Sequence, residues 1–83
     1  MEAKRIGVIA VVIEDPAAVQ ATLNQWISEA GSIIVGRIGI PYRERNVALL
    51  ALLVDGSNDE INALTGRLGT LPGVNVRAAL AKN

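Results

Sequence analysis

The sequence contains neither cysteine nor histidine. Without them there are no disulfides, no thiolate nucleophiles, no metal sites built from Cys or His, and no imidazole to transfer protons near neutral pH. No recognisable nucleophile with a neighbouring base takes their place. We therefore expect no metal, no cofactor and no catalytic residues, that is, a protein that is not an enzyme.

An excess of positive charge is also lacking, because eight Lys and Arg balance eight Asp and Glu. Domains that bind nucleic acid directly take much of their affinity from a basic excess, so no direct nucleic-acid partner is expected. The longest apolar run, residues 6–13, is far shorter than the ~20 residues of a membrane helix. Glu14, Asp15 and Pro16 follow this run where a signal peptide needs small neutral residues. We expect a cytoplasmic protein with no membrane partner.

Apolar residues are plentiful, at 51% of the chain against 19% charged residues. This balance is typical of a folded protein and excludes a disordered tail. A length of 83 residues is enough for one small domain. We expect a single domain over residues 1–83.

Four segments have the composition of β-strands. Residues 5–13 and 47–54 are apolar on both faces, as in central strands, and Asp55-Gly56 is expected to end the second of them. Residues 33–40 contain two glycines and Arg37, which suits an edge strand, and Pro41 is expected to end it. Residues 74–78 alternate between apolar and polar side chains.

Two segments between these strands have helical spacing. Asp15-Pro16 provides an N-cap and a first-turn proline, and Gly31 is placed for a left-handed C-cap. Ser57 and Glu60 have the spacing of a capping box, which predicts the start of a second helix. The apolar stripes of the two helices are Val19, Leu23, Trp26, Ile27 and Ala30, and Ile61, Leu64, Leu68 and Leu71.

The resulting order, βαββαβ, predicts an α+β, ferredoxin-like two-layer sandwich with a four-stranded antiparallel sheet in the order four, one, three, two. Both helices cover one face of this sheet. Each central strand, however, offers apolar side chains to both faces, so one set has no cover within the chain. The alternating sets are Ile6, Val8, Val12, Val47, Leu49 and Leu53, and Ile9, Val11, Ile13, Leu50, Leu52 and Val54.

Burial of six aliphatic side chains is worth roughly 9 kcal/mol at ~1.5 kcal/mol each, which is comparable to the whole stability of a small domain. Soluble proteins tolerate scattered exposed apolar residues but rarely a contiguous patch. We therefore expect a homo-oligomer, either a dimer or a tetramer.

Four segments carry a family resemblance: GRIGIPYRER at 36–45, LVDGSNDEI at 53–61, ALTGRLG at 63–69 and LPGV at 71–74. Together they closely resemble the small proteins named as regulators of iron-only hydrogenase systems, over nearly the full chain. The resemblance implies an ACT-like domain, similar to the C-terminal regulatory domain of nickel-responsive repressors, that associates into dimers or tetramers. Nickel binding does not carry over, because the His and Cys ligands are absent. Ala17 stands where ligand-binding ACT domains often have glycine after this turn.

A candidate effector or anion site lies at the end of the second strand and in its turn. It comprises Arg37, Tyr42, Arg43, Arg45 and Asn46. Arginine side chains here could grip a carboxylate or phosphate with their bidentate forks. The alternative is a solvated, charge-protected edge in which Glu44 pairs with these arginines. Tyr42 could stack on a ligand or seal a subunit contact.

Three other positions have a structural and a functional interpretation. Trp26 lies on the helix stripe and is expected in the core. Gly66 lies inside a helix, where it costs ~1 kcal/mol against alanine, so we expect it to allow close packing. Asp15 and Asp55 both end strands and could pair, but no acid–base role is assigned to them.

These observations favour an oligomeric regulatory module that binds a small effector or a protein partner. A small oligomeric enzyme with a pocket between sheet and helices is the alternative, and it predicts polar groups inside an apolar cavity. A regulator's site is expected at a subunit boundary near residues 37–46. A purely structural adaptor predicts no pocket.

Overall fold

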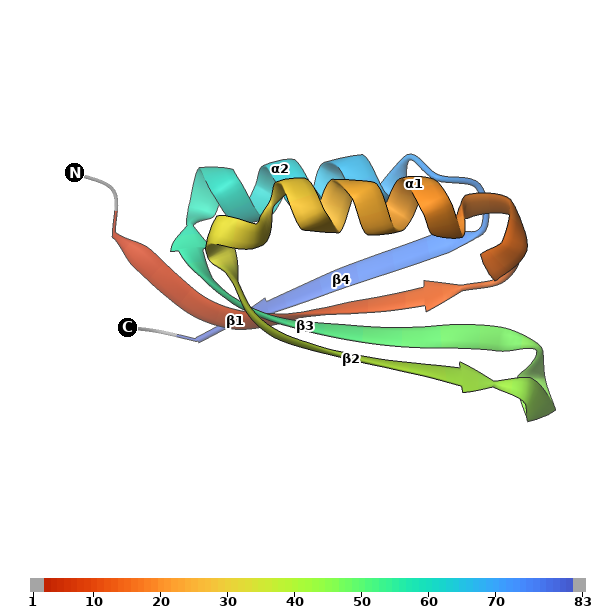
Figure 1. Cartoon of the computed structure of the whole chain (residues 1–83). Helices are drawn as coiled ribbons and strands as arrows, with labels where there is room; N and C mark the ends of the chain where they lie inside the picture. The colour runs from red at the N-terminus through yellow and green to blue at the C-terminus, as the bar shows by residue number, and fades with distance from the viewer. Residues whose placement is uncertain (1–2, 82–83) are drawn as a thin grey trace.

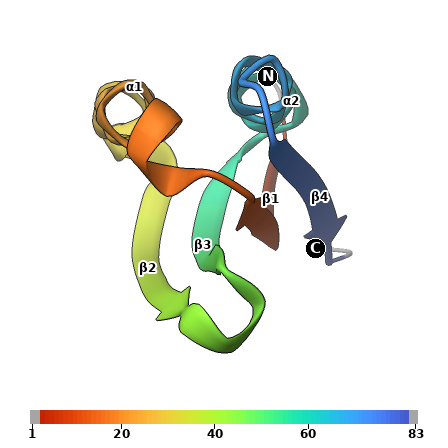
Figure 2. The same cartoon turned by 90° about the vertical axis from the view of Figure 1, so that its right-hand side faces the viewer.

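The computed structural model describes residues 3–81. In this part of the chain one layer of helices packs on one sheet (Figures 1 and 2). The strands are β1 (Lys4–Ile13), β2 (Ile34–Tyr42), β3 (Val47–Ser57) and β4 (Val74–Leu80); the helices are α1 (Pro16–Glu29) and α2 (Asn58–Gly69); short 3₁₀ turns are η1 (Gly31–Ile33) and η2 (Arg43–Arg45). The sheet is antiparallel with the order β2-β3-β1-β4. Both helices lie on one face of it, so the predicted ferredoxin-like α+β fold is confirmed.

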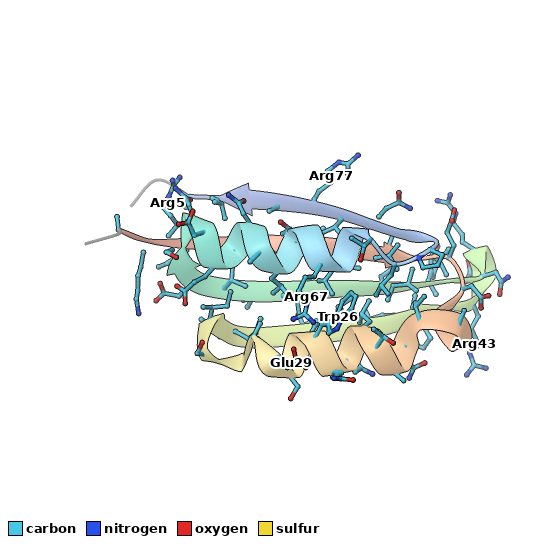
Figure 3. All side chains as sticks on the ribbon, turned by 90° about the horizontal axis from the view of Figure 1, so that it is seen from above. Arg5, Trp26, Glu29, Arg43, Arg67 and Arg77 are labelled. Atoms are coloured by element: carbon cyan, nitrogen blue, oxygen red, sulfur yellow. The ribbon has the colours of Figure 1, made fainter. Side chains whose placement is uncertain are left out.

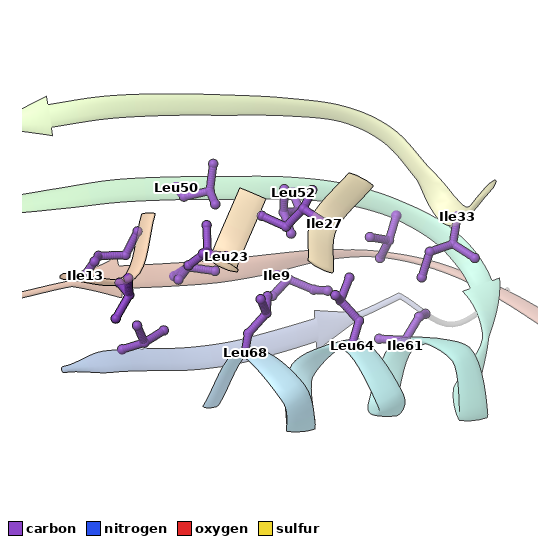
Figure 4. Close-up of a cluster of buried hydrophobic side chains, with 14 residues drawn as sticks. Ile9, Ile13, Leu23, Ile27, Ile33, Leu50, Leu52, Ile61, Leu64 and Leu68 are labelled. Carbon is purple, nitrogen blue, oxygen red and sulfur yellow. The ribbon is translucent and has the colours of Figure 1, made fainter. Parts of the chain in front are cut away.

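The hydrophobic core fills the space between the helices and this face (Figure 4). Ile9 from β1, Leu52 from β3 and Ile61 from α2 are completely buried. Their neighbours come from the odd positions of β1, the even positions of β3 and the stripes of both helices. Trp26 packs against the core but is only partly buried, because it lies at the boundary between α1 and α2, next to Arg67.

The second strand differs from its prediction at both ends. A β-bulge at Val35 separates the pairs Ile34–Val54 and Gly36–Leu53, so one extra residue is accommodated in β2. Pro41 does not end the strand, which continues to Tyr42. Proline is tolerated there because β2 is an edge strand, where one row of backbone donors has no partner strand to bond.

The third strand is longer than predicted. Asp55 and Gly56 do not end it, because they pair with Ile6 and Arg5 of β1, and the strand continues to Ser57. The prediction was wrong because β1 pairs with β3 as far as Ser57. Asp55 and Gly56 therefore stay extended, although this dipeptide often forms a turn.

The two helices begin differently. In α2 the predicted capping box is present: the Ser57 hydroxyl accepts a hydrogen bond from the Glu60 amide at 3.1 Å, and Glu60 accepts one from the Ser57 amide at 2.9 Å. Asp15 stands at the N-cap of α1, but its side chain makes no capping hydrogen bond. The predicted left-handed C-cap at Gly31 is wrong, because the chain passes directly into η1. The glycine with positive φ is Gly73, at 72°, in the turn before β4.

Candidate functional site

The face of the sheet opposite the helices is largely apolar, and no part of residues 3–81 covers it. On β1, Ile6 is 65% exposed and Val8 39%, and on β3, Leu53 is 42% exposed. These residues alternate with the buried positions of the same strands. The uncovered set is therefore the one that contains Ile6 and Leu53, and Figure 2 shows no helix on this side of the sheet.

Strand β2 extends this surface. Ile38 pairs with Ala51 and Ile40 with Leu49 of the open face, and both isoleucines are more than half exposed. The bulge at Val35 determines this arrangement, because it places Ile34 on the helix side and Ile38 on the open side of the same strand. We call this surface, which comprises Ile6, Val8, Val12, Ile38, Ile40, Leu49 and Leu53, the open face.

A groove of about 320 Å³ lies on the other side of the sheet, between α1 and the β2–β3 hairpin. Helix α1 contributes Gln20, Leu23 and Asn24 to its wall. The strands contribute small or short residues at helix-facing positions, where Gly39 pairs with Leu50 and Pro41 with Ala48. The groove exists because these residues leave unfilled the space that larger side chains would occupy.

The groove includes only one of the predicted site residues. Arg37 lines it from β2, opposite Leu52, and donates a hydrogen bond from Nη2 to Asn24 Oδ1 at 3.1 Å. Tyr42 pairs with Val47 at the far end of β2 and is exposed. Arg43 and Arg45 are exposed in η2, at the end of the molecule where the hairpin turns (Figure 3). Asn46 follows in the left-handed region, with φ of 56°.

Glu44 does not act as the internal partner that the alternative interpretation assigned to it. Within residues 3–81 the ion pair is between Arg67 and Glu29, at 3.0 Å. The guanidinium groups of Arg37, Arg43 and Arg45 thus have no carboxylate within ion-pair distance in this part of the chain. These groups remain available to an anion, and the anion site itself stays a prediction.

A cluster of three side chains between the two helices was not predicted from the sequence. The Arg67 guanidinium lies over the Trp26 ring, 4.6 Å from its centroid, and also pairs with Glu29 (Figure 3). Hydrogen bonds from Gln25 and Arg67 lower the pKa of Glu29 below its ordinary value. No local spacing could reveal this contact, because Arg67 lies 38 residues from Glu29 in the sequence.

Two further predictions concern isolated residues. A Cβ on Gly66 would meet no atom within 4 Å, so this glycine does not allow close packing within the chain. Asp15 and Asp55 lie at opposite ends of the sheet, because Asp15 follows the C-terminal end of β1 and Asp55 pairs with Ile6 near its start. They do not form a carboxylate pair.

No cluster of three or more acidic, His or Cys residues able to hold a metal ion occurs within residues 3–81. Neither α1 nor α2 is long and apolar enough to cross a membrane.

Comparison with protein families matches residues 5–78 to the family described as "TM1266-like: Iron-only hydrogenase system regulator, putative". The chain belongs to this family. The match includes both helices and all or most of each strand, and it confirms the resemblance carried by the glycine and arginine pattern of the sequence. Among curated proteins, a search finds no significant match.

Three solved structures are similar to this chain. The uncharacterized protein TM1266 from Thermotoga maritima is 34% identical, with a TM-score of 0.90 over 95% of this chain and 99% of that one. The ACT domain from GTP pyrophosphokinase of Chlorobium tepidum is 17% identical, with a TM-score of 0.71 over 96% and 89%. SnoaB, a cofactor-independent oxygenase from Streptomyces nogalater, is 12% identical, with a TM-score of 0.58 over 98% and 94%. The last two show the fold alone, and the ACT-like architecture is confirmed.

Proposed function

We propose that this protein is an oligomeric, non-catalytic regulator of an iron-only hydrogenase system, which acts in the cytoplasm by binding a small effector or a protein partner. The observation that carries the proposal is the open face. It is a contiguous surface of aliphatic side chains on β1 to β3, with Asp55 at its margin opposite Ile6. Such a surface suits association rather than a reaction. The family to which the chain belongs supports the regulatory role.

The energetics favour a second copy of the chain as the cover of this surface. Its large side chains are between 37% and 65% exposed, so full coverage is worth roughly 5 kcal/mol per chain at ~1.5 kcal/mol per fully buried aliphatic residue. Two open faces related by a twofold axis would cover each other, which gives a dimer, and a further contact would give a tetramer.

Sedimentation velocity tests the assembly. We expect the wild-type protein to sediment as a dimer or larger species from micromolar concentration upward. Leu53→Glu should shift it to monomer, because the new carboxylate would lose its hydration in the interface. Ala21→Glu, on the exposed side of α1, is the matched control and should leave the assembly unchanged. A wild-type monomer throughout this range would contradict the oligomeric proposal.

A genetic experiment tests the regulatory role. Removal of the gene from its host should change the transcript level or the activity of the iron-only hydrogenase, and the wild-type gene should restore it. Restoration should fail with Leu53→Glu if assembly is required. Unchanged hydrogenase transcripts and activity in the deletion strain would contradict regulation.

A small enzyme is the second candidate, and the groove between α1 and the sheet favours it. Gln20, Asn24 and Arg37 bring polar groups to an otherwise apolar wall, as the enzyme alternative predicted, and SnoaB, with the same fold, is an oxygenase. The groove has no carboxylate among its lining residues to act as a base. Turnover of a substrate by purified protein, lost in a variant whose groove is filled, would replace the regulatory proposal. A purely structural adaptor does not account for the groove.

A further inference from the structure

The groove beside α1 has an apolar floor formed by the strands, and Arg37 is the charged residue in its lining. Its helix-facing strand positions are Gly39, Pro41, Ala48 and Leu50, which are apolar and mostly short. Its volume of about 320 Å³ lies at the lower end of the ~300 to 1,000 Å³ typical of small-molecule pockets. A ligand that fits here is small and largely apolar.

Arg37 determines the sign of the charge that such a ligand would carry. Its guanidinium donates to Asn24 Oδ1 and has no carboxylate partner within residues 3–81. Several of its N–H groups therefore remain free to bind a planar acceptor, and a carboxylate matches this fork with two parallel hydrogen bonds. The amide groups of Asn24 and Gln20, which also line the groove, add neutral donors.

The lining also contains no Asp or Glu. A ligand with an ammonium group, such as an amino acid, would bring a second charge into the groove without a partner for it. Loss of hydration without a compensating charge is costly for such a group. The groove thus favours a simple carboxylic acid over an amino acid with the same carbon chain.

We infer that this groove binds a short-chain aliphatic monocarboxylate, with the carboxylate on Arg37 and the hydrocarbon chain over Gly39 and Ala48. The inference rests on the proposed function for the role of this ligand as the effector, but not for its binding. It also separates Arg37 from the other residues of the predicted anion site, which lie outside the groove.

Calorimetric titration with butanoate, hexanoate and octanoate tests the site. Each added methylene is worth ~0.8 kcal/mol when buried, so affinity should increase by about fourfold per methylene until the groove is full. Hexanoate should bind more tightly than norleucine, hexanamide or hexanol. Backbone amide shifts in a ¹⁵N spectrum should change at Asn24, Gly39 and Ala48.

Three variants locate the interaction. Arg37→Gln should weaken hexanoate binding by about tenfold or more, because it removes charge-assisted hydrogen bonds. Gly39→Val should block the groove, since a Cβ at this position meets only Leu50 Cδ1 at 3.6 Å and is accommodated without a clash. Arg77→Gln, which changes an exposed arginine of β4 outside the groove, is the matched control and should bind as the wild type does.

The outcomes are distinct. Equal binding of hexanoate and hexanol, or spectral changes confined to β1 and the open face, would mean nonspecific uptake by the apolar surface and would overturn the inference. So would unaltered binding in Arg37→Gln, or no binding by any of the acids. Any of these results, together with an altered hydrogenase in the deletion strain, would leave the regulatory proposal intact. Carboxylate binding without any effect of the deletion would refute regulation but not the site.

Discussion

At the scale of single residues, two glycines of this chain have opposite surroundings. Gly7 is buried in β1, and a Cβ there would lie 2.5 Å from the backbone oxygen of Ala79 and 2.5 Å from a methyl group of Leu80. Gly66 is exposed on α2, and a Cβ there would meet nothing within 4 Å. The first glycine is required by the close approach of β4, whereas the second only weakens its helix.

We expect Gly7→Ala to destabilise the protein by about 1–3 kcal/mol, because the clash involves a strand backbone that cannot rotate away. Gly66→Ala should instead stabilise it by up to about 1 kcal/mol through helix propensity. Urea denaturation of both variants measures these changes. Stabilisation by Gly7→Ala would show that β4 can move away from β1 at little cost.

At the scale of elements, the start of α2 depends on the reciprocal bonds between Ser57 and Glu60. The backbone and side-chain hydrogen bonds to Ser57, aided by Lys4, lower the pKa of Glu60 below its ordinary value. A lowered folded-state pKa means that the ionised carboxylate stabilises the fold above the ordinary pKa. This contribution is lost as the pH falls through the lowered value.

Ser57→Ala should cost about 1 kcal/mol at neutral pH, because an N-cap acceptor is lost. Glu60→Gln can keep the hydrogen bond to the Ser57 amide but removes the titrating group. Its stability should therefore approach that of the wild type as the pH is lowered through the carboxylate range. Denaturation series at neutral and acidic pH measure both effects, and a constant difference between Glu60→Gln and the wild type would contradict the assignment.

The contact between α1 and α2 through Arg67 is a second feature at this scale. Both partners of its ion pair are about half exposed, so Arg67→Ala should cost at most about 1 kcal/mol. The pKa of Glu29 should increase toward its ordinary value in this variant, because one of its two hydrogen-bond donors is lost. NMR titration of the Glu29 carboxyl carbon, with Arg77→Ala as control, tests this.

At the scale of the whole molecule, the open face determines the stability of an assembly. Two chains gain together roughly 10 kcal/mol from its coverage, whereas association costs an estimated ~4–15 kcal/mol in lost freedom of motion. The terms are similar in size, so the proposed assembly is concentration-dependent.

The melting temperature should accordingly increase with protein concentration for the wild type, because mass action favours the associated native form. It should be independent of concentration for Leu53→Glu. Differential scanning calorimetry over a wide range of concentrations measures both. A wild-type melting temperature that does not change with concentration would contradict a dissociating assembly.

Much of this architecture was predictable from local patterns. The β-branched runs of β1 and β3 indicated central strands, and Ser57 with Glu60 indicated the start of α2. The bulge at Val35 was not predictable, because it depends on how β2 aligns with β3 and not on any residue of its own. For the same reason the sequence did not predict the outward positions of Ile38 and Ile40. It also did not predict which residues line the groove, because this depends on the side to which Arg37 and Gly39 face.

The bulge also links the two surfaces of this molecule mechanically. Every side chain of β2 beyond Val35 takes its side from that one extra residue. If the ladder slipped by one position and absorbed the bulge, Ile38 and Ile40 would turn inward and Arg37 would turn outward. The open face would lose two isoleucines and gain an arginine, and the groove would lose the guanidinium group of Arg37 in the same change. A single register change in an edge strand would thus weaken both self-association and anion binding.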